Sequence, residues 1–416
     1  MKNVIEDVTC AGCCCVCDDI QVTTDGQQIL EVQTDCPQGQ AWFKQSLQTD
    51  SLAPLVKGVA ASHQDAVTSA VDLIQNAQAP LIYGMPQSAT DAQRAAVCLA
   101  DQIGATIDTG ASATTRALQQ VGEATCTLGE VRSRADLIIY WGADDLLANQ
   151  CHRQSLISGS QEVPRTILSL GAEFSHSSEY VDKTIPLEPQ QEMEVIWSLR
   201  ASLKGIDFGG KQPLGVSAAA LQELVSLIQQ SKYIVFFYGP EFKEGPLSHR
   251  KIEALSLLMQ ELQADRRCHG ISVPHAGETK GAENVLAWQT GYAASVNFAA
   301  GYPRYSPGEY SANALLEQEE CDLCVLVGAN PLSGLTACAQ QRLAQIPVIL
   351  IGPATVEIPG LHVFLPTGVS GIHFPGSVYR FDGTPLPLRG YVSTIQSSEA
   401  AVVSEIISMV NQSAAR

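Results

Sequence analysis

Hydrophobic and polar positions alternate between two patterns along most of the chain. Short apolar runs end in glycine or proline, and the longer stretches between them carry apolar residues at helical spacing. We predict helices over 65–77 and 92–104, and strands at 80–84, 134–142, 165–171 and 183–187. Strands that alternate with helices usually pair in parallel and have helices on both faces, so the pattern predicts an α/β fold.

The second half of the chain repeats this order of strands. Apolar runs at 233–239, 321–328, 347–352 and 362–366 correspond to the four strands of the first half. The separation is 186 residues from Asp136 to Asp322, about 181 and 179 for the next two pairs, and near 154 for the first pair. The value for the first pair indicates an insertion between Gly239 and Cys321. Chance similarity among buried strands is the alternative explanation.

The repeat predicts two similar doubly wound parallel-sheet lobes, at 51–205 and 206–416. A linker between them is expected at Gly205–Gly215, which is rich in glycine, lysine and proline. The stretch Gly291–Glu309 contains many Gly, Tyr and Pro residues and is expected to be an irregular surface or interface loop.

Residues 1–50 form a separate cysteine-rich module that contains six of the thirteen cysteines. Four of these have the spacing C-x2-C-x3-C-x18-C: Cys10, Cys13, Cys17 and Cys36. Three close thiolates and one distant thiolate suit a 4Fe–4S cluster, and Gly39 lets the chain turn closely around it. A zinc site is an alternative, although the third cysteine and the long return fit zinc less well. A hairpin around Asp25–Gly26 is expected to connect Cys17 with Cys36.

The charge and hydropathy of the chain exclude several classes of partner. The net charge is −18 and the pI is about 4.8, so no basic face is available for a nucleic acid. No apolar run is long enough to span a membrane, and the first residues lack an apolar signal core. We therefore expect a cytoplasmic protein with reduced thiols, in which clustered cysteines favour a metal over disulfides.

The carboxyl ends of the predicted strands are the expected ligand sites, as in other open α/β sheets. Gly328, Asn330 and Pro331 follow one strand; the glycine admits a phosphate and the Asn330 amide can donate to a cofactor. A plain turn is the alternative. The equivalent positions of the first half carry Asp144 and Asp145, whose charges would repel a pyrophosphate.

Other candidate residues are isolated. His152 is a lone histidine and is expected to be structural or surface-exposed rather than catalytic. His269 and His275 could bind a ligand but lack a third partner at metal spacing. Cys321 and Cys324 flank an apolar strand and are expected in the core. The sequence has no nucleophile elbow, P-loop or HExxH motif, so we assign no catalytic residue.

The module followed by α/β lobes resembles the molybdopterin oxidoreductases, and more narrowly the B-type subunit of formylmethanofuran dehydrogenase. The matching stretches are Cys17–Ile20, Cys36–Gly39, Val121–Gly122, Thr125–Glu130, Arg134–Gly142, Val327–Pro331 and Tyr379–Gly383. The resemblance implies a 4Fe–4S cluster. In active members it also implies tungsten or molybdenum, held by two pterin dinucleotides and one cysteine or selenocysteine.

The metal-ligating residue of the family corresponds to a position near Gly110 in this sequence. No cysteine lies between Cys98 and Cys126, so the resemblance implies that the metal–pterin cofactor is absent.

A bacterial branch of the family is part of the formyltransferase/hydrolase complex of tetrahydromethanopterin-linked one-carbon metabolism. There the expected role is structural and redox-silent. The expected partners are a formyltransferase, an amidohydrolase-like hydrolase and a protein similar to the C-type subunit, with neither nucleic acid nor membrane. An active tungsten or molybdenum dehydrogenase subunit, and an iron–sulfur electron-transfer subunit without pterin, are the alternatives.

Overall fold

The computed structural model describes two compact units. The described residues are 2–414, except 86, 111–112, 144–145, 147–148, 157–163, 172–179, 188–190, 207–215, 244, 246, 275–279, 355–357 and 359. Unit 1 combines residues 1–111, 276–380 and 385–416, and unit 2 consists of 112–275 and 381–384. Most of the predicted linker, and the residues Asp144, Asp145 and His275, lie outside the described part.

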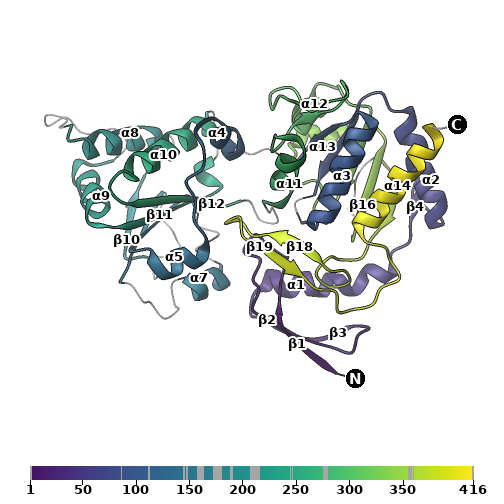
Figure 1. Cartoon of the computed structure of the whole chain (residues 1–416), viewed down its shortest axis with the longest axis horizontal. Coiled ribbons are helices and arrows are strands. Elements are labelled where there is room, and N and C mark those ends of the chain that lie inside the picture. Colours follow the sequence, from purple (N-terminus) through teal and green to yellow (C-terminus); the bar gives the residue numbers. More distant parts are fainter. Residues whose placement is uncertain are drawn as a thin grey trace. The chain divides into compact units, whose positions relative to one another are not determined.

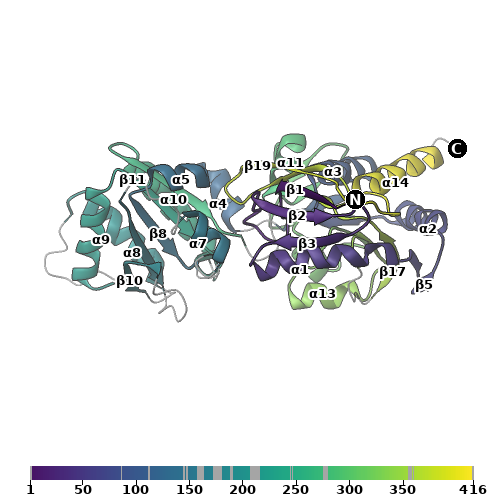
Figure 2. The same cartoon turned by 90° about the horizontal axis from the view of Figure 1, so that it is seen from below.

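The cysteine module of unit 1 is a small antiparallel sheet next to one helix (Figure 2). Its elements are β1 (Asn3–Val8), β2 (Ile20–Thr24), β3 (Ile29–Gln33) and α1 (Pro37–Gln45), followed by a 3-10 turn at Ser46–Ser51. The predicted hairpin joins β2 and β3, and the amides of Gln27 and Gln28 donate to Asp25 Oδ1 at 2.9 Å each. The module shares its core with residues 369–392, including Ile372 and Leu388.

Unit 1 contains a sheet of nine described strands whose centre is parallel. The order is β14-β13-β7-β6-β15-β16-β17-β4-β5, and β7 through β17 pair in parallel. The strands are β4 (Leu55–Val56), β5 (Val59–Ala60), β6 (Pro80–Gly84), β7 (Thr106–Asp108), β13 (Val296–Asn297), β14 (Arg304–Tyr305), β15 (Leu323–Val327), β16 (Val348–Gly352) and β17 (Leu361–Pro366). The hairpin of β18 (Gly376–Tyr379) and β19 (Pro385–Leu388) lies beside the module core.

Helices cover both faces of this sheet, as predicted. On one face lie α2 (His63–Asn76), α3 (Thr90–Ile103), α11 (Gly281–Thr290) and α14 (Glu399–Ala414), and on the other α12 (Ala312–Glu317) and α13 (Ala337–Leu343). Neighbouring residues of a strand point to opposite faces: Ile82 packs with the first group of helices, and Leu81 and Tyr83 pack with the second. Figure 1 shows α14 between α2 and α3.

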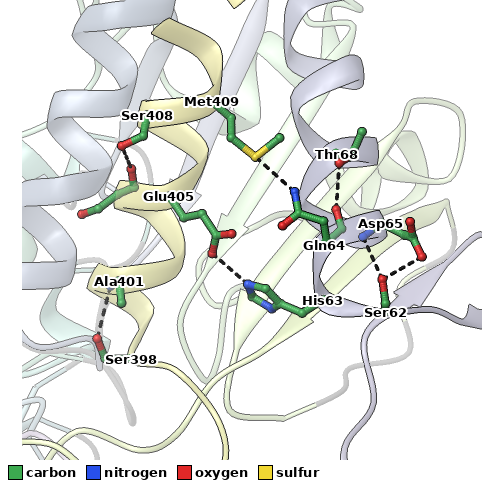
Figure 3. A network of polar contacts seen from close by, with 11 residues as sticks. Ser62, His63, Gln64, Asp65, Thr68, Ser398, Ala401, Glu405, Ser408 and Met409 are labelled. Atoms are coloured by element: carbon green, nitrogen blue, oxygen red, sulfur yellow. Dashed lines mark hydrogen bonds and ion pairs between the residues drawn. The ribbon is translucent and has the colours of Figure 1, made fainter. Parts of the chain in front are cut away.

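Polar contacts connect α2 and α14 at the protein surface (Figure 3). His63 Nε2 lies 2.8 Å from Glu405 Oε2, and Ser62 caps α2 by accepting from the Asp65 amide at 3.1 Å. The His63 and Glu405 side chains are 41% and 38% exposed, so this pair contributes at most about 1 kcal/mol. The apolar contacts of the two helices therefore hold α14 in place.

Unit 2 contains a fully parallel sheet of five described strands. The order is β10-β9-β8-β11-β12. The strands are β8 (Leu137–Trp141), β9 (Thr166–Gly171), β10 (Lys183–Pro186), β11 (Tyr233–Tyr238) and β12 (Arg267–Ser272). The helices are α4 (Ala113–Val121), α5 (Leu128–Arg134), α7 (Gln150–Leu156), α8 (Glu192–Leu203), α9 (Ala218–Gln230) and α10 (Ser248–Leu262), with a 3-10 turn at Glu241–Lys243.

The strand repeat predicted from the sequence is present, but its two halves are interleaved. β7-β6-β15-β16-β17 of unit 1 and β12-β11-β8-β9-β10 of unit 2 have the same order. Each of these five-strand sets takes one pair of strands from one half of the chain and three strands from the other half. The predicted lobes 51–205 and 206–416 are therefore corrected to the two units above. The strand pattern predicts eight of these ten strands and misses β7 and β12. Their pairing depends on contacts distant in sequence.

Asp136 and Asp322, which define the repeat, have the same role in the two sheets. The Asp136 carboxylate accepts the amides of Lys232 and Tyr233 at 2.8 and 2.9 Å. The Asp322 carboxylate accepts those of Gln78 and Ala79 at 2.7 and 2.9 Å. Each aspartate thus ties the start of one central strand to the start of its neighbour from the other half.

We expect Asp322→Ala to lower the free energy of unfolding of unit 1 by about 1–3 kcal/mol, because it removes the acceptor of two backbone amides. Hydrogen exchange of peptides from β6 and β15 measures this loss. Asp136→Ala should produce the same loss in β8 and β11 only. Equal protection of β6 and β15 in wild type and Asp322→Ala would show that the carboxylate contributes nothing there.

Two further sequence predictions concern the surface. Among the described residues, no helix combines the length and the apolar character needed to cross a membrane. The expected irregular loop at Gly291–Glu309 contains the short β13–β14 hairpin, and Tyr302 in it is 61% exposed.

Candidate functional site

Three of the four predicted cluster ligands lie in one short loop between β1 and β2. Cys10 and Cys13 are buried, and Cys17 is half-buried. The Cys10 amide donates to the Cys17 carbonyl at 2.8 Å, and the Val16 amide donates to the Cys13 carbonyl at 3.3 Å. The Gly12 amide faces the Cys10 sulfur at 3.5 Å. These bonds fold the loop back on itself, and they place an N–H donor against a sulfur that would carry negative charge.

The fourth ligand, Cys36, is buried and precedes the first residue of α1. Pro37 at that position suits a helix start, because its fixed φ and missing N–H cost nothing there. A Cβ on Gly39 would lie 3.6 Å from the Cys10 sulfur and 3.7 Å from Cys36 Cβ. The first turn of α1 therefore brings Cys36 and Cys10 to the same place.

This donor set fits a 4Fe–4S cluster. All four donors are soft thiols, and the chain around them is closely packed and largely shielded from water. Among the residues that the structure describes, no three His, Cys, Asp or Glu side chains converge as a single metal ion requires. A cubane needs a wider arrangement, because each thiolate binds a different iron. The assignment of Cys10, Cys13, Cys17 and Cys36 stays a prediction.

Cys14 and Cys15 are buried beside these residues. Hydrogen bonds with the Cys13 and Cys14 thiols, together with burial, raise the pKa of the Cys15 thiol well above its ordinary value. Cys15 is thus a neutral thiol packed against one predicted ligand.

Substitution of the cysteines distinguishes ligands from neighbours. We expect Cys13→Ser to lower the iron retained by the anaerobically purified chain severalfold, because serine replaces a soft thiolate with a poor ligand for the cluster. Cys14→Ser, a buried cysteine one residue away, is the matched control and should retain the wild-type amount. Equal iron in the two variants would contradict the assigned ligands. Iron content is measured by inductively coupled plasma mass spectrometry.

Gly328, Asn330 and Pro331 lie at the carboxyl end of β15, as predicted. Gly328 has a φ of +103°, and its amide donates to the Ile351 carbonyl at 2.9 Å. Pro331 is buried against Gly84 at the end of β6, while Asn330 is exposed. A Cβ on Gly328 would lie 2.9 Å from the Ser88 hydroxyl, so the loop after β6 covers this glycine.

The cavity beside these strand ends has a volume of about 20 Å³. It is lined by Trp42, Gln87, Ala329, Pro353, Val369, Ser370 and Glu399. Such a volume holds about one water molecule. A pterin dinucleotide does not fit this cavity, so we derive no chemical step through such a cofactor.

Glu399, the first residue of α14, was not predicted as a site residue. It is 6% exposed, and burial raises its pKa to about 7. The buried Glu399 Oε2 and Ser88 Oγ have no hydrogen-bond partner among the described residues. An acidic residue in the first turn of a helix is common, so the sequence carries no signal for this burial.

Gly110, near which the family has its metal-ligating residue, lies at the end of β7 with a φ of +78°. A Cβ there would lie 3.1 Å from the Tyr83 hydroxyl, which donates to the Ser333 carbonyl at 2.5 Å. The left-handed backbone disfavours a side chain at this position. Ala111 and Ser112 lie outside the described residues.

His152 is a core residue of unit 2. It is 2% exposed, its Nε2 lies 2.8 Å from the Tyr140 hydroxyl, and Phe237 and Phe381 pack against its ring. Burial lowers its pKa to about 3, so it is neutral at physiological pH. This supports the predicted structural role.

Two stretches that carry the family resemblance contact each other in unit 2. Thr127 and Glu130 form a capping box at the start of α5, and the Leu128 amide donates to Asp382 Oδ2 at 2.8 Å. Their joint presence in the sequence therefore has a structural reason.

The other candidates are also structural. The His269 ring packs against Tyr233 with 5.1 Å between centroids, and burial lowers its pKa. Cys321 and Cys324 are both buried in the core of unit 1, as predicted.

Curated relatives of the chain are the B-type subunits of two kinds of complex. The chain is 29% identical over 412 aligned positions, 94% of either protein, to the B-type subunit of tungsten-containing formylmethanofuran dehydrogenase 2 of Methanocaldococcus jannaschii. It is 26% identical over 363 positions, 84% of this chain and 92% of the relative, to the B-type subunit of the formyltransferase/hydrolase complex Fhc of Methylorubrum extorquens. No family model matches the chain.

Solved structures share the fold. A chain of the formyltransferase/hydrolase complex FhcABCD of Methylorubrum extorquens, crystallised with methylofuran, superposes with a TM-score of 0.73, 21% identity, and coverage of 88% of this chain and 100% of that one. Acetylene hydratase of Pelobacter acetylenicus superposes with a TM-score of 0.66, 10% identity, and coverage of 98% and 70%. The chain belongs to the family of the formylmethanofuran dehydrogenase B-type subunit, which includes the corresponding subunit of the formyltransferase/hydrolase complex.

Proposed function

We propose that the chain is the B-type subunit of a formyltransferase/hydrolase complex in tetrahydromethanopterin-linked one-carbon metabolism, where it has a structural, redox-silent role. The carrying observation is the absence of a cysteine near Gly110, since none lies between Cys98 and Cys126. A tungsten or molybdenum centre of the family takes one protein thiolate or selenolate there.

In this role the chain retains a 4Fe–4S cluster at Cys10, Cys13, Cys17 and Cys36. When bound, the cluster supplies a rigid cross-link among β1, β2 and α1, and one-electron redox capacity that the complex does not use. The proposed partners are the formyltransferase, the amidohydrolase-like hydrolase and a protein similar to the C-type subunit, in the cytoplasm. The presence of a homologous chain in the FhcABCD complex supports a multi-subunit assembly.

An active tungsten dehydrogenase subunit is the second candidate. The observation in its favour is the identity of 29% to a tungsten-containing dehydrogenase subunit, against 26% to the formyltransferase/hydrolase relative. The missing thiolate near Gly110 counts against it.

Activity of the complex purified through a tag on this chain tests the proposal. We expect release of formate from the formylated carrier without an electron acceptor, and no reduction of viologen by formate. The same complex carrying Cys13→Ser should release formate at the wild-type rate, because the chemistry resides in other subunits. Viologen reduction at a rate comparable to formate release would contradict the structural role.

A further inference from the structure

Strand β3 and helix α1 of the cysteine module lie next to each other (Figure 2), and a groove separates them. Its volume is about 360 Å³, which is within the usual range of binding sites. The walls are residues 29–32 of β3 and three residues on one face of α1: Gln40, Phe43 and Lys44. None of the predicted cluster ligands lines the groove, so the proposed function gives it no role.

The outer edge of β3 has no strand beside it in the described part of the chain. The sheet of the module has the order β1-β2-β3, and β3 pairs with β2 alone. A register shift leaves Leu30 without a partner on β2, and its side chain is 40% exposed, whereas the pairing from Glu31 to Gln33 is regular. An open edge offers backbone N–H and C=O groups to a further strand. An extended peptide can pair with such an edge and place its alternate side chains in a neighbouring pocket.

The opposite edge of the same sheet is less suited to strand addition. There β1 carries two adjacent charges, Glu6 and Asp7, and the φ of Asp7 is +55°. Charges and an irregular backbone on an edge strand hinder the addition of another strand. β3 carries the single charge of Glu31, and its Ile29 and Val32 side chains pack against the core of the module. The groove therefore lies beside the more accessible of the two edges.

We propose that this groove binds an extended segment of another protein subunit, which adds a strand to β3. The inference rests on the proposed function for the source of the segment. The buried Phe43 and the exposed Leu30 select apolar side chains at alternate positions of the segment. Glu31 and Lys44 line the groove and have no ion-pair partner among the described residues, so the segment supplies one basic and one acidic side chain. A second copy of this chain is disfavoured, because each copy carries a net charge of −18.

Hydrogen exchange of the intact complex, purified anaerobically through a tag on this chain, tests the added strand. We expect the β3 peptide to exchange at least about tenfold more slowly than in the full chain alone, because its free edge becomes hydrogen-bonded. The β1 peptide should exchange at the same rate in both samples. Leu30→Asp and Lys44→Glu should return β3 in the complex to the rate of the chain alone. Val4→Asp, on β1 and 59% exposed, is the matched control and should keep the protection of β3.

A photo-crosslinker identifies the occupant of the groove. With p-benzoylphenylalanine in place of Leu30, the purified complex should form a crosslink to one segment of another subunit, identified by mass spectrometry. A crosslinked dimer of this chain would overturn the proposal in favour of a second copy.

The outcomes separate this inference from the proposed function. Unprotected β3 in a complex that releases formate overturns the docking site and leaves the proposed function standing, as does protection that persists in Leu30→Asp and Lys44→Glu. A chain that purifies without other subunits overturns both. If Leu30→Asp also loses the protection of β2, the module has unfolded, and Lys44→Glu, which changes an exposed side chain, decides.

Discussion

Replacement of Gly239 by alanine is expected to unfold unit 2. Gly239 follows β11, and a Cβ there would lie 1.9 Å from the Gly142 carbonyl oxygen and 2.5 Å from Ala143 Cα. These are backbone atoms held by the sheet: the Gly239 amide donates to the Trp141 carbonyl at 2.9 Å, and the Gly142 amide to that of Leu170 at 3.2 Å. We expect a loss of more than about 4 kcal/mol, above the usual range for overpacking.

Hydrogen exchange of β8 and β11 measures this effect, since both strands should lose protection. Gly308→Ala is the control, because a Cβ there meets nothing within 4 Å and no positive φ is required. It should change the free energy of unfolding by less than about 0.5 kcal/mol. A Gly239→Ala chain with wild-type protection in β8 and β11 would contradict the packing of these two strand ends.

A fall in pH below neutrality is expected to destabilise unit 2 and to stabilise unit 1. In unit 2 the pKa of His152 is lowered from 6.5 to about 3. A lowered pKa means that the folded state binds fewer protons than the unfolded state. The contribution of neutral His152 to the stability of unit 2 is therefore complete above pH 6.5 and declines as the pH falls toward about 3. Each unit of pKa shift corresponds to about 1.4 kcal/mol, which makes the total several kcal/mol.

In unit 1 the sign is reversed. The pKa of Glu399 is raised from 4.5 to about 7, so the folded state binds more protons than the unfolded state. The contribution of the protonated Glu399 carboxyl to the stability of unit 1 is complete below pH 4.5 and is lost as the pH rises through about 7. The total change in the free energy of unfolding is about 3 kcal/mol.

Hydrogen exchange between pH 4 and 8, read separately on peptides of the two sheets and corrected for the intrinsic exchange rate, measures both trends. Glu399→Gln should abolish the loss of unit 1 stability between pH 4.5 and about 7, and His152→Gln should weaken the acid sensitivity of unit 2. The same pH trend in both units, or no response to either substitution, would show that these two groups do not control the pH dependence.

Eight of the ten equivalent strands could be predicted from the sequence, but β7, β12 and the pairing of the strands could not. Buried parallel strands such as 137–141 and 323–327 carry a local signal, because both faces are covered and nearly every residue is apolar. The same signal is present in β6, β11 and β16, so it does not indicate which strand lies beside which. The exchange of strand pairs between halves depends on contacts such as Asp322 with Gln78, which are 244 residues apart.

The candidate site likewise contains residues that could be predicted from the sequence and residues that could not. The spacing of Cys10, Cys13 and Cys17 is local, and the structure folds them into one loop. Glu399 reaches its position only through the packing of the C-terminal helix α14, and it stands in no recognisable motif. For the isolated His152 the sequence predicts a structural or a surface-exposed residue, and its burial in the core of unit 2 decides for the first.

Metal analysis of the complex, purified anaerobically through this chain, tests the account most directly. We predict about four iron atoms per chain, the content of one cubane held by Cys10, Cys13, Cys17 and Cys36, and neither tungsten nor molybdenum. Tungsten or molybdenum in stoichiometric amount would contradict the structural role, because it would require a metal centre without the thiolate that is missing near Gly110.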